Sequence, residues 1–139
     1  MKEINFFYEE VNLEIDEEAT SRWLFDCIKR YGHFPSITLN YIFCDDEYLL
    51  DINQKHLDHD YYTDIITFDY CEDDLLASDL YISIDRVKDN AEKLGVEFMN
   101  ELHRVMIHGV LHLIGYKDKL EKDKLEMTKQ ENICLARLK

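Results

Sequence analysis

Residues 102–119 read Leu-His-Arg-Val-Met-Ile-His-Gly-Val-Leu-His-Leu-Ile-Gly-Tyr-Lys-Asp-Lys, a largely apolar run that contains His108 and His112 four residues apart. On a helix, residues i and i+4 lie on one face about one turn apart, so the two imidazoles can reach a single ion. Gly115 favours the left-handed conformation that ends a helix. The chain can then turn back and bring Asp118 toward the two histidines.

These three side chains match the donor set of a catalytic zinc site, which has two neutral imidazoles, one carboxylate and an open position for water. We predict one Zn²⁺ per chain, bound by His108, His112 and Asp118, and we identify no catalytic residue beyond the metal-bound water. The alternative is that both histidines are packing residues whose ring nitrogens have hydrogen-bond partners. An isolated histidine on an apolar face is usually of that kind, but the spacing, the following glycine and the carboxylate together favour a metal.

The length of 139 residues corresponds to one ordinary domain, and 46% hydrophobic residues can form a sizeable core. We therefore predict a single metal-dependent hydrolase domain over residues 1–139. No stretch approaches the roughly 20 apolar residues that span a membrane. The start of the chain lacks the apolar segment of a signal peptide, so no membrane partner is expected.

The cysteines Cys27, Cys44, Cys71 and Cys134 are far apart and form no Cys-x-x-Cys pair. This spacing is typical of small core residues in a reducing compartment, and it argues against a disulfide framework or a thiolate metal site. We therefore predict a cytoplasmic protein.

The formal net charge of −14 argues against non-specific attraction to nucleic acid, because an acidic surface repels a polyanion. The charge is unevenly distributed: residues 1–114 carry 9 Lys/Arg against 25 Asp/Glu, whereas residues 115–139 carry 7 against 5. The net basic segment therefore begins beside the predicted metal site, where Lys117 and Lys119 are candidate substrate contacts. Taken alone, the lysines of this segment are more simply explained as a solvated helix face.

Hydrophobic periodicity predicts helices and strands in the order β-α-β-α-β-β-α-α-α. The predicted strands cover residues 3–7, 37–43, 65–70 and 80–84, and the last two are expected to pair as a hairpin through the acidic turn 71–74. The predicted helices cover residues 16–30, 85–95, 97–114 and 120–138. One more helix begins at residues 45–46 and precedes an irregular segment, residues 56–63.

This order predicts a single mixed α+β domain with a sheet of about four strands. Helix 97–114 is apolar around most of its second half, which is typical of a buried helix. The second helix is expected to direct Tyr48, Leu49, Ile52 and His56 inward. The last helix is expected to be amphipathic through its apolar residues Leu125, Ile133, Leu135 and Leu138.

The run His108-Gly-Val-Leu-His112-Leu-Ile-Gly-Tyr116 resembles the signature of the YbeY endoribonucleases, His-Gly-x-Leu-His-Leu-x-Gly-Tyr followed by Asp-His. Upstream, Thr63-Asp64-Ile-Ile-Thr-Phe68 is similar to that family's Thr-Asp-Val-Leu-Ser-Phe strand. Ser78-Asp79-Leu-Tyr-Ile-Ser83 is similar to its Gly-Asp-Ile strand. The resemblance extends from about Leu39 to Tyr116 in the family's order and spacing.

The resemblance implies a zinc-dependent endoribonuclease specific for single strands, acting in 16S rRNA 3′ end maturation and in late-stage ribosome quality control. The expected partners are therefore single-stranded or ribosomal RNA and ribosomal particles. The resemblance also implies a small mixed four-stranded sheet covered by helices, with the metal site at one end of the buried helix.

Two positions depart from the family's pattern. The family's usual third histidine falls where this chain has Asp118, and a carboxylate oxygen binds zinc at nearly the same distance as an imidazole nitrogen, so the site is expected to survive with altered charge. The family often has an arginine, suited to a phosphate contact, in the loop before Thr-Asp, and the corresponding position here is Leu57. Candidates to replace that arginine are Arg104, Lys55, His56 and His59.

Gly109 stands where the His-Glu-x-x-His motif of zinc proteases has its general-base glutamate, so a protease mechanism would lack its base. Phosphodiester cleavage can run with a metal as the main charge stabiliser. Gly109 also has a structural explanation, since a small residue lets a strand pack tightly against a buried helix. Two further functions stay open: a metallohydrolase of peptides or small molecules, and a non-catalytic zinc-stabilised module that binds the ribosome.

Four more positions carry expectations. Asp64 is expected to hold its loop by hydrogen bonds, or alternatively to orient a histidine ligand. Tyr116 is expected to be half-buried in the helix-ending turn, with base stacking as the alternative. If Asp118 does not bind the metal, Glu121 and Asp123 are the next candidates.

Overall fold

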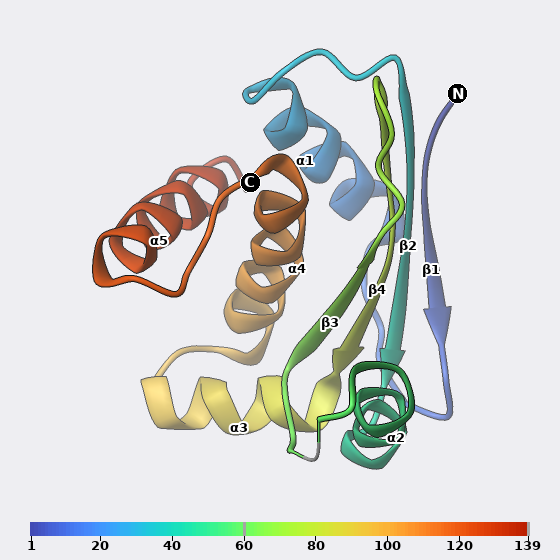
Figure 1. The fold of residues 1–139 in the computed structure, drawn as a ribbon. Helices are drawn as coiled ribbons and strands as arrows, with labels where there is room; N and C mark the ends of the chain where they lie inside the picture. The colour runs from blue at the N-terminus through green and yellow to red at the C-terminus, as the bar shows by residue number, and fades with distance from the viewer. Residues whose placement is uncertain (60, 139) are drawn as a thin grey trace.

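The structure is a computed structural model that describes residues 1–59 and 61–138, and over these residues the helices and strands follow the predicted order (Figure 1). The strands are β1 (Lys2–Tyr8), β2 (Ser36–Cys44), β3 (Ile65–Asp69) and β4 (Leu75–Ser83). The helices are α1 (Glu17–Lys29), α2 (Asp46–Leu57), α3 (Ile84–Leu94), α4 (Phe98–Ile114) and α5 (Glu121–Leu135).

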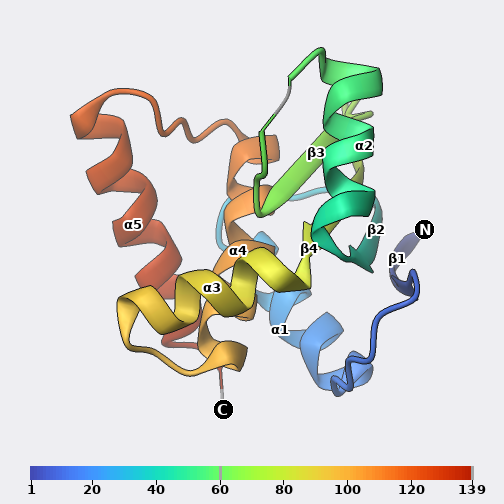
Figure 2. The same ribbon diagram turned by 90° about the horizontal axis from the view of Figure 1, so that it is seen from below.

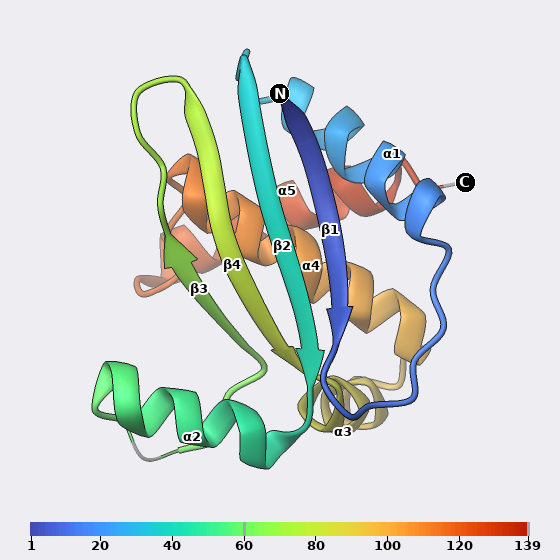
Figure 3. The same ribbon diagram turned by 90° about the vertical axis from the view of Figure 1, so that its right-hand side faces the viewer.

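The strands form one mixed four-stranded sheet in the order β1-β2-β4-β3, which confirms the predicted α+β class. β1, β2 and β4 are parallel, and β3 pairs antiparallel with β4 as the predicted hairpin. In Figure 3 the sheet lies in front of α4, which crosses behind the strands. On the other face, α2 packs Leu49 against Ile66 of β3.

β4 begins at Leu75, before the predicted start at residue 80. Leu76, Ala77 and Ser78 are buried one after another, so this part of the strand has no alternation of apolar and polar residues. β4 pairs with β2 on one side and with β3 on the other, and such an interior strand is covered on both faces. The predicted start was therefore wrong, because period-two alternation marks only half-buried strands.

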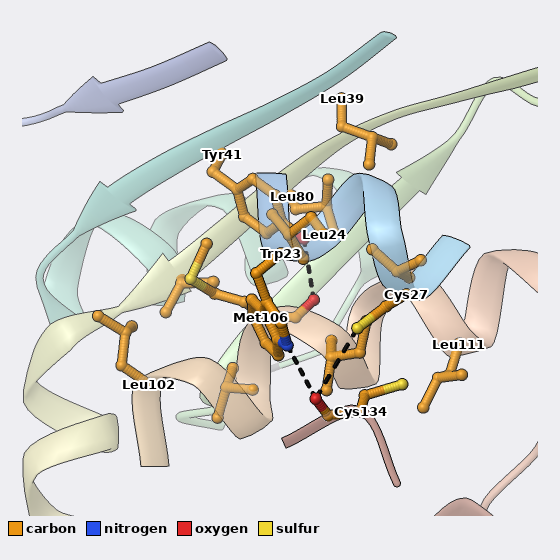
Figure 4. Packing of buried hydrophobic residues seen from close by; sticks show 14 of the residues in the cluster. Trp23, Leu24, Cys27, Leu39, Tyr41, Leu80, Leu102, Met106, Leu111 and Cys134 are labelled. Atoms are coloured by element: carbon orange, nitrogen blue, oxygen red, sulfur yellow. Dashed lines mark hydrogen bonds between the residues drawn. The ribbon is translucent and has the colours of Figure 1, made fainter. Parts of the chain in front are cut away.

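α4 is the buried central helix of the fold, as predicted. Two buried hydrogen bonds link it and its neighbours to the rest of the core (Figure 4). The Tyr41 hydroxyl of β2 donates to the Met106 carbonyl of α4 at 2.9 Å, and Trp23 Nε1 of α1 donates to the Cys134 carbonyl of α5 at 2.8 Å. The apolar α4 side chains without exposed surface are Leu102, Met106, Ile107, Val110 and Leu111.

Gly109 lets α4 lie close against the hairpin of β3 and β4. A Cβ atom at this position would lie 2.7 Å from Leu80 Cδ2 and 2.8 Å from Ile65 Cδ1. Both distances are shorter than packed carbon atoms allow, since favourable contacts lie at about 3.5–4.0 Å. The structural explanation of this glycine is therefore confirmed.

The buried faces predicted for α5 and α2 were wrong in part. Leu125 is 71% exposed, and α5 instead buries a face that contains Glu131. Tyr48 and His56 are exposed, whereas Leu49 is buried, and Asn53 occupies the next buried position of α2. In both helices a polar residue takes a core position, and both polar residues belong to the site described below.

The cysteines are free thiols, three of them buried and Cys71 partly exposed, in agreement with their prediction as core residues. Over the described part of the chain, no helix combines the length and the apolar character that crossing a bilayer requires. Predictions of a single domain over residues 1–139 and of a cytoplasmic location stay predictions.

Candidate metal centre

The C-terminal half of α4 positions the two histidines. Their ring centroids are 4.5 Å apart, and their planes are nearly perpendicular, at 87°. The helix ends at Gly115, whose φ of 125° is a conformation that favours glycine. After this turn the chain returns, and Asp118 lies beside His108 and His112.

The Nε2 atoms of both rings converge on one carboxylate oxygen. His108 Nε2 lies 3.3 Å from Asp118 Oδ2, and His112 Nε2 lies 3.2 Å from the same atom. One possible ligand atom from each residue lies within 4.8 Å of the other two. The structure therefore brings together the three residues predicted as ligands.

The other ring nitrogen of each histidine faces an acceptor. His112 Nδ1 lies 3.0 Å from the carbonyl oxygen of Tyr116, which can only accept, so this nitrogen carries the proton. His108 Nδ1 lies 2.6 Å from Oε2 of Glu131, a carboxylate oxygen that favours the same tautomer. In their neutral forms both rings therefore direct a lone pair from Nε2 toward Asp118.

Three lone-pair atoms that face one another at such distances favour a cation between them. An ionised Asp118 has no proton to donate, and neither does Nε2 of a neutral ring in this tautomer. Two imidazoles and one carboxylate suit a borderline divalent metal and leave positions open for water or substrate. All three side chains are partly exposed, so the residues present fit a metal ion that solvent and substrate can reach.

Glu131 on α5 completes the centre, and it was not predicted from the sequence. This residue is only 6% exposed, and its carboxylate bridges His108 Nδ1 and Arg104 Nη1, the latter at 2.9 Å from Oε1. Burial by itself would lower the pKa of His108, but the hydrogen bond and charge of Glu131, with two further carboxylates nearby, raise it above its ordinary value. The surroundings of His108 therefore favour positive charge.

The predicted substrate contacts Arg104, Lys117 and Lys119 differ in their surroundings. The Arg104 guanidinium is bound to α5, since Nη2 donates to Asn132 Oδ1 at 2.8 Å while Nη1 pairs with Glu131. Lys117 and Lys119 are exposed on either side of Asp118 in the chain. Their roles in binding substrate stay predictions.

The candidate ligands line a cleft of about 350 Å³. The rest of its wall comes from α2, the α2–β3 connection and β3, and it includes Asn53, Leu57, His59, Tyr61 and Asp64. In Figure 2, α4 lies between α5 on the left and α2 with β3 on the right. Among the described residues that line this cleft, none is lysine or arginine.

Asp64 lies in the wall of the cleft immediately before β3. Its carbonyl accepts from the Ser83 amide at 2.9 Å, and its Oδ2 lies 3.5 Å from Nδ2 of Asn90. Burial raises the pKa of its carboxyl group. These contacts agree with the expected role in holding the loop, whereas the acceptor that orients His108 is Glu131.

Tyr116 is half-buried in the turn after α4, as expected. Its ring packs edge-on against Tyr31, with centroids 5.8 Å apart, and its carbonyl is the partner of His112. Leu57, at the position where the resemblance places an arginine, directs an apolar side chain to the cleft.

Comparisons with known proteins find relatives of this chain. A family model described as Endoribonuclease YbeY matches residues 4–139. A protein of that name from Porphyromonas gingivalis is 49% identical over 140 aligned residues, which cover 100% of this chain and 92% of the relative. Proteins of the same name from Karelsulcia muelleri and Cytophaga hutchinsonii are 49% and 48% identical, each over 98% of this chain and over 96% and 97% of their own lengths.

The fold also has a solved counterpart. The solution structure of a protein from Thermotoga maritima superposes with a TM-score of 0.67 at 24% sequence identity. The match covers 99% of this chain and 89% of the other. At this identity the likeness concerns the arrangement of the sheet and helices alone.

Proposed function

The chain belongs to the family of YbeY endoribonucleases, and from this premise we propose that it cleaves single-stranded RNA at a metal ion held by His108, His112 and Asp118. The observation that carries the proposal is the convergence of both Nε2 atoms on Asp118 Oδ2, at 3.3 and 3.2 Å, in the wall of a cleft. If the two histidines were only packing residues, each ring nitrogen would instead have its own hydrogen-bond partner.

Zinc is the metal that we propose, at one ion per chain. Many catalytic zinc sites have two imidazoles and one carboxylate as ligands and leave one coordination position open. When bound, such an ion supplies Lewis-acid stabilisation of the phosphoryl group and a nucleophile near neutral pH. Asp118 brings a negative charge where the YbeY signature has a neutral histidine, so the centre has a lower net positive charge.

The protein's own groups prepare the centre for that ion. Glu131 and the Tyr116 carbonyl hold the two rings in one tautomer, so both Nε2 lone pairs are already aligned. The Arg104 guanidinium balances the buried charge of Glu131. Gly109 offers no proton acceptor beside the histidines, which disfavours the protease mechanism.

We propose ribosomal RNA as the natural substrate. The specific expectation is 16S rRNA 3′ end maturation and late-stage ribosome quality control in the cytoplasm, with ribosomal particles as partners. Support comes from the YbeY signature and from the net basic segment 115–139, which contains a ligand of the proposed ion. A duplex is expected to be a poor substrate, because its backbone is held in a helix and does not bend easily into the cleft.

Cleavage of an end-labelled single-stranded RNA by the zinc-loaded protein tests this function. We expect slow cutting that a chelator abolishes, little cutting of the same strand in a duplex, and none by the His108→Ala, His112→Ala double variant. His33→Ala is the matched control, because His33 is exposed and lines a different hollow.

Three other outcomes would reject the nuclease. Zinc-loaded protein that never cuts single-stranded RNA, even with ribosomal particles present, would contradict the proposal. Hydrolysis of an unstructured peptide but not of RNA would favour a peptide hydrolase. Co-sedimentation with ribosomal particles by inert, zinc-loaded protein would favour a binding module.

The third ligand is tested by two substitutions of Asp118. Asp118→Ala should lower zinc affinity by more than the roughly 10- to 100-fold that follows loss of an outer partner, because a donor to the ion is removed. Asp118→His should retain the ion, since imidazole nitrogen binds zinc at a similar distance. Competition against a chromophoric zinc chelator measures both, and unchanged affinity of Asp118→Ala would move the search to Glu121 and Asp123.

A further inference from the structure

The proposed function leaves open how an acidic protein holds RNA in this cleft. Phosphate groups are normally bound by lysine and arginine, yet the described cleft wall contains neither. The groups of this wall that can carry charge near neutral pH are histidines and the carboxylates of Asp64 and Asp118. Contacts other than ion pairs must therefore provide much of the affinity for RNA, in addition to the metal.

The α2–β3 connection provides a contact of another kind. The rings of His59 and Tyr61 are stacked, with centroids 5.1 Å apart and planes inclined by 23°, and the Tyr61 hydroxyl lies 3.0 Å from His59 Nδ1. Both residues line the cleft that contains the candidate ligands, and Tyr61 is nonetheless 56% exposed. An aromatic face is thus presented to solvent in the wall of the proposed active site.

Asn53 fixes the chain at both of these residues. It is a buried residue of α2, and its carbonyl accepts from the His59 amide at 3.1 Å. Its side-chain Nδ2 donates to the Tyr61 carbonyl at 2.9 Å. The backbone of the aromatic pair is therefore positioned before any ligand binds, which lowers the entropy that binding must overcome.

The size and continuity of the cleft identify the occupant. A volume of about 350 Å³ is near the lower end of the roughly 300–1,000 Å³ found for small-molecule sites, which suits one nucleotide. Base stacking on an aromatic side chain contributes roughly 1–3 kcal/mol per base in proteins that bind single strands, and it accepts any base because every base has a π-face. The stacked rings and the candidate ligands share this one cleft, so a strand bound at the metal lies within reach of the rings.

We propose that His59 and Tyr61, here named the His59–Tyr61 stack, form a stacking site for one nucleobase of the single-stranded RNA whose phosphate lies at the metal centre. The proposal rests on the proposed function, because it takes RNA as the substrate. It assigns the stack to binding and positioning, and the strand is cut at the metal centre.

Binding of short labelled oligoribonucleotides to the zinc-loaded full chain tests the stack, measured within a time too short for the slow cutting. Tyr61→Ala should weaken binding by about 5- to 150-fold, the range that corresponds to the loss of one stacked base. Tyr61→Phe keeps the aromatic face and should bind within about twofold of the parent. Tyr70→Ala is the matched control, because Tyr70 is 54% exposed but lines a different hollow.

Two further measurements locate the base. In a series of oligoribonucleotides that each lack one base, one abasic position should weaken the parent and leave Tyr61→Ala unaffected, as expected when both changes remove one interaction. Strands that carry 5-iodouridine at that position should crosslink on irradiation to Tyr61 or His59, as mapped by mass spectrometry.

These experiments can overturn the His59–Tyr61 stack and the proposed nuclease function independently of each other. Binding by Tyr61→Ala within about twofold of the parent, with crosslinks at other residues, would overturn the stack even if the parent cuts RNA. Crosslinking at Tyr61 by a zinc-loaded parent that never cuts would support the stack and reject the nuclease. A parent that binds no oligoribonucleotide would overturn the stack.

Discussion

Glu131 links the candidate metal centre to the packing of α5. One carboxylate oxygen holds His108 Nδ1 at 2.6 Å, and the other binds Arg104 at 2.9 Å. A ligating histidine whose second nitrogen donates to a carboxylate is fixed in orientation and is a stronger donor to a metal. Any change that moves α5 should therefore alter metal affinity through the contact between Glu131 and His108.

Replacing Glu131 by Gln tests this link. The amide keeps the shape and an acceptor oxygen but removes the negative charge, so zinc affinity should fall by about 10- to 100-fold, the range typical of outer partners. Glu126→Gln is the control, since Glu126 is an exposed residue of the same helix. Competition with a zinc chelator measures both variants, and equal affinity for Glu131→Gln and the parent would show that the contact has no effect on the metal.

The ligands could be predicted from the sequence because they are close in it. His108 and His112 follow helical spacing, and the glycine after them predicts the turn that returns Asp118. Glu131 lies on another helix, and only tertiary packing brings it to His108. The one available signal was its place between Met127 and Cys134, at the i, i+4, i+7 spacing of a buried helix face.

Among the secondary-structure elements, α4 and the hairpin of β3 and β4 depend on each other through Gly109. The hypothetical Cβ contacts of 2.7 and 2.8 Å show that the helix lies where no larger side chain fits without movement. The atoms in the way are the ends of the Leu80 and Ile65 side chains, so some adjustment is possible. His108 and His112 flank this glycine on the same helix, which makes the contact part of the support of the metal centre.

Gly109→Ala should destabilise the fold only slightly, and Gly109→Val strongly. Crowding in a packed core costs about 1–3 kcal/mol, whereas replacing a helical glycine by alanine regains about 1 kcal/mol, so the net loss for Ala is about 0–2 kcal/mol. Valine adds two more methyl groups and should cost about 3 kcal/mol or more. Urea denaturation measures the free energy of unfolding.

Gly32→Ala is the control for these variants. Its Cβ would lie 3.5 Å from the Phe34 ring, an ordinary contact, so stability should stay unchanged or rise by up to about 1 kcal/mol. If Gly109→Val were as stable as the parent, the close approach of α4 to the hairpin would be wrong.

Element type and order were predictable where periodicity is strong. Strand β2 and helices α1, α3 and α4 have clear patterns, and their observed bounds differ from the predicted ones by at most one residue at each end. The first half of β4 was missed because a strand covered on both faces does not alternate. The inner face of α5 was misassigned because apolar residues were taken as its only buried residues, whereas Gln130 and Glu131 are buried.

The whole molecule carries a net charge of −14, which limits how it can bind RNA. Each phosphate neutralised on a single strand contributes about −0.7 to the slope of log affinity against log salt. With few cations near the centre, we expect a shallow slope, on the order of −1 to −3. Measured affinities across a salt series provide the test, and a slope far steeper than this would show an extensive phosphate interface elsewhere.

The lysines beside Asp118 are the candidates for these few phosphate contacts. Reversing Lys117 and Lys119 to Glu should weaken RNA binding while leaving the zinc content unchanged. The control is reversal of Lys88 on α3, outside the segment 115–139. Equal RNA binding by the parent and the double reversal would remove both lysines from the binding surface.

Titration of the metal-free protein with Zn²⁺, with cleavage of single-stranded RNA followed at each addition, tests the central claim most directly. We predict that cleavage is absent at the start, rises in proportion to added zinc and levels off at one ion per chain. The His108→Ala, His112→Ala double variant should remain inactive throughout the same titration. Cleavage by the metal-free parent, or full activity in the double variant, would contradict the claim that these histidines and Asp118 hold the ion at which RNA is cut.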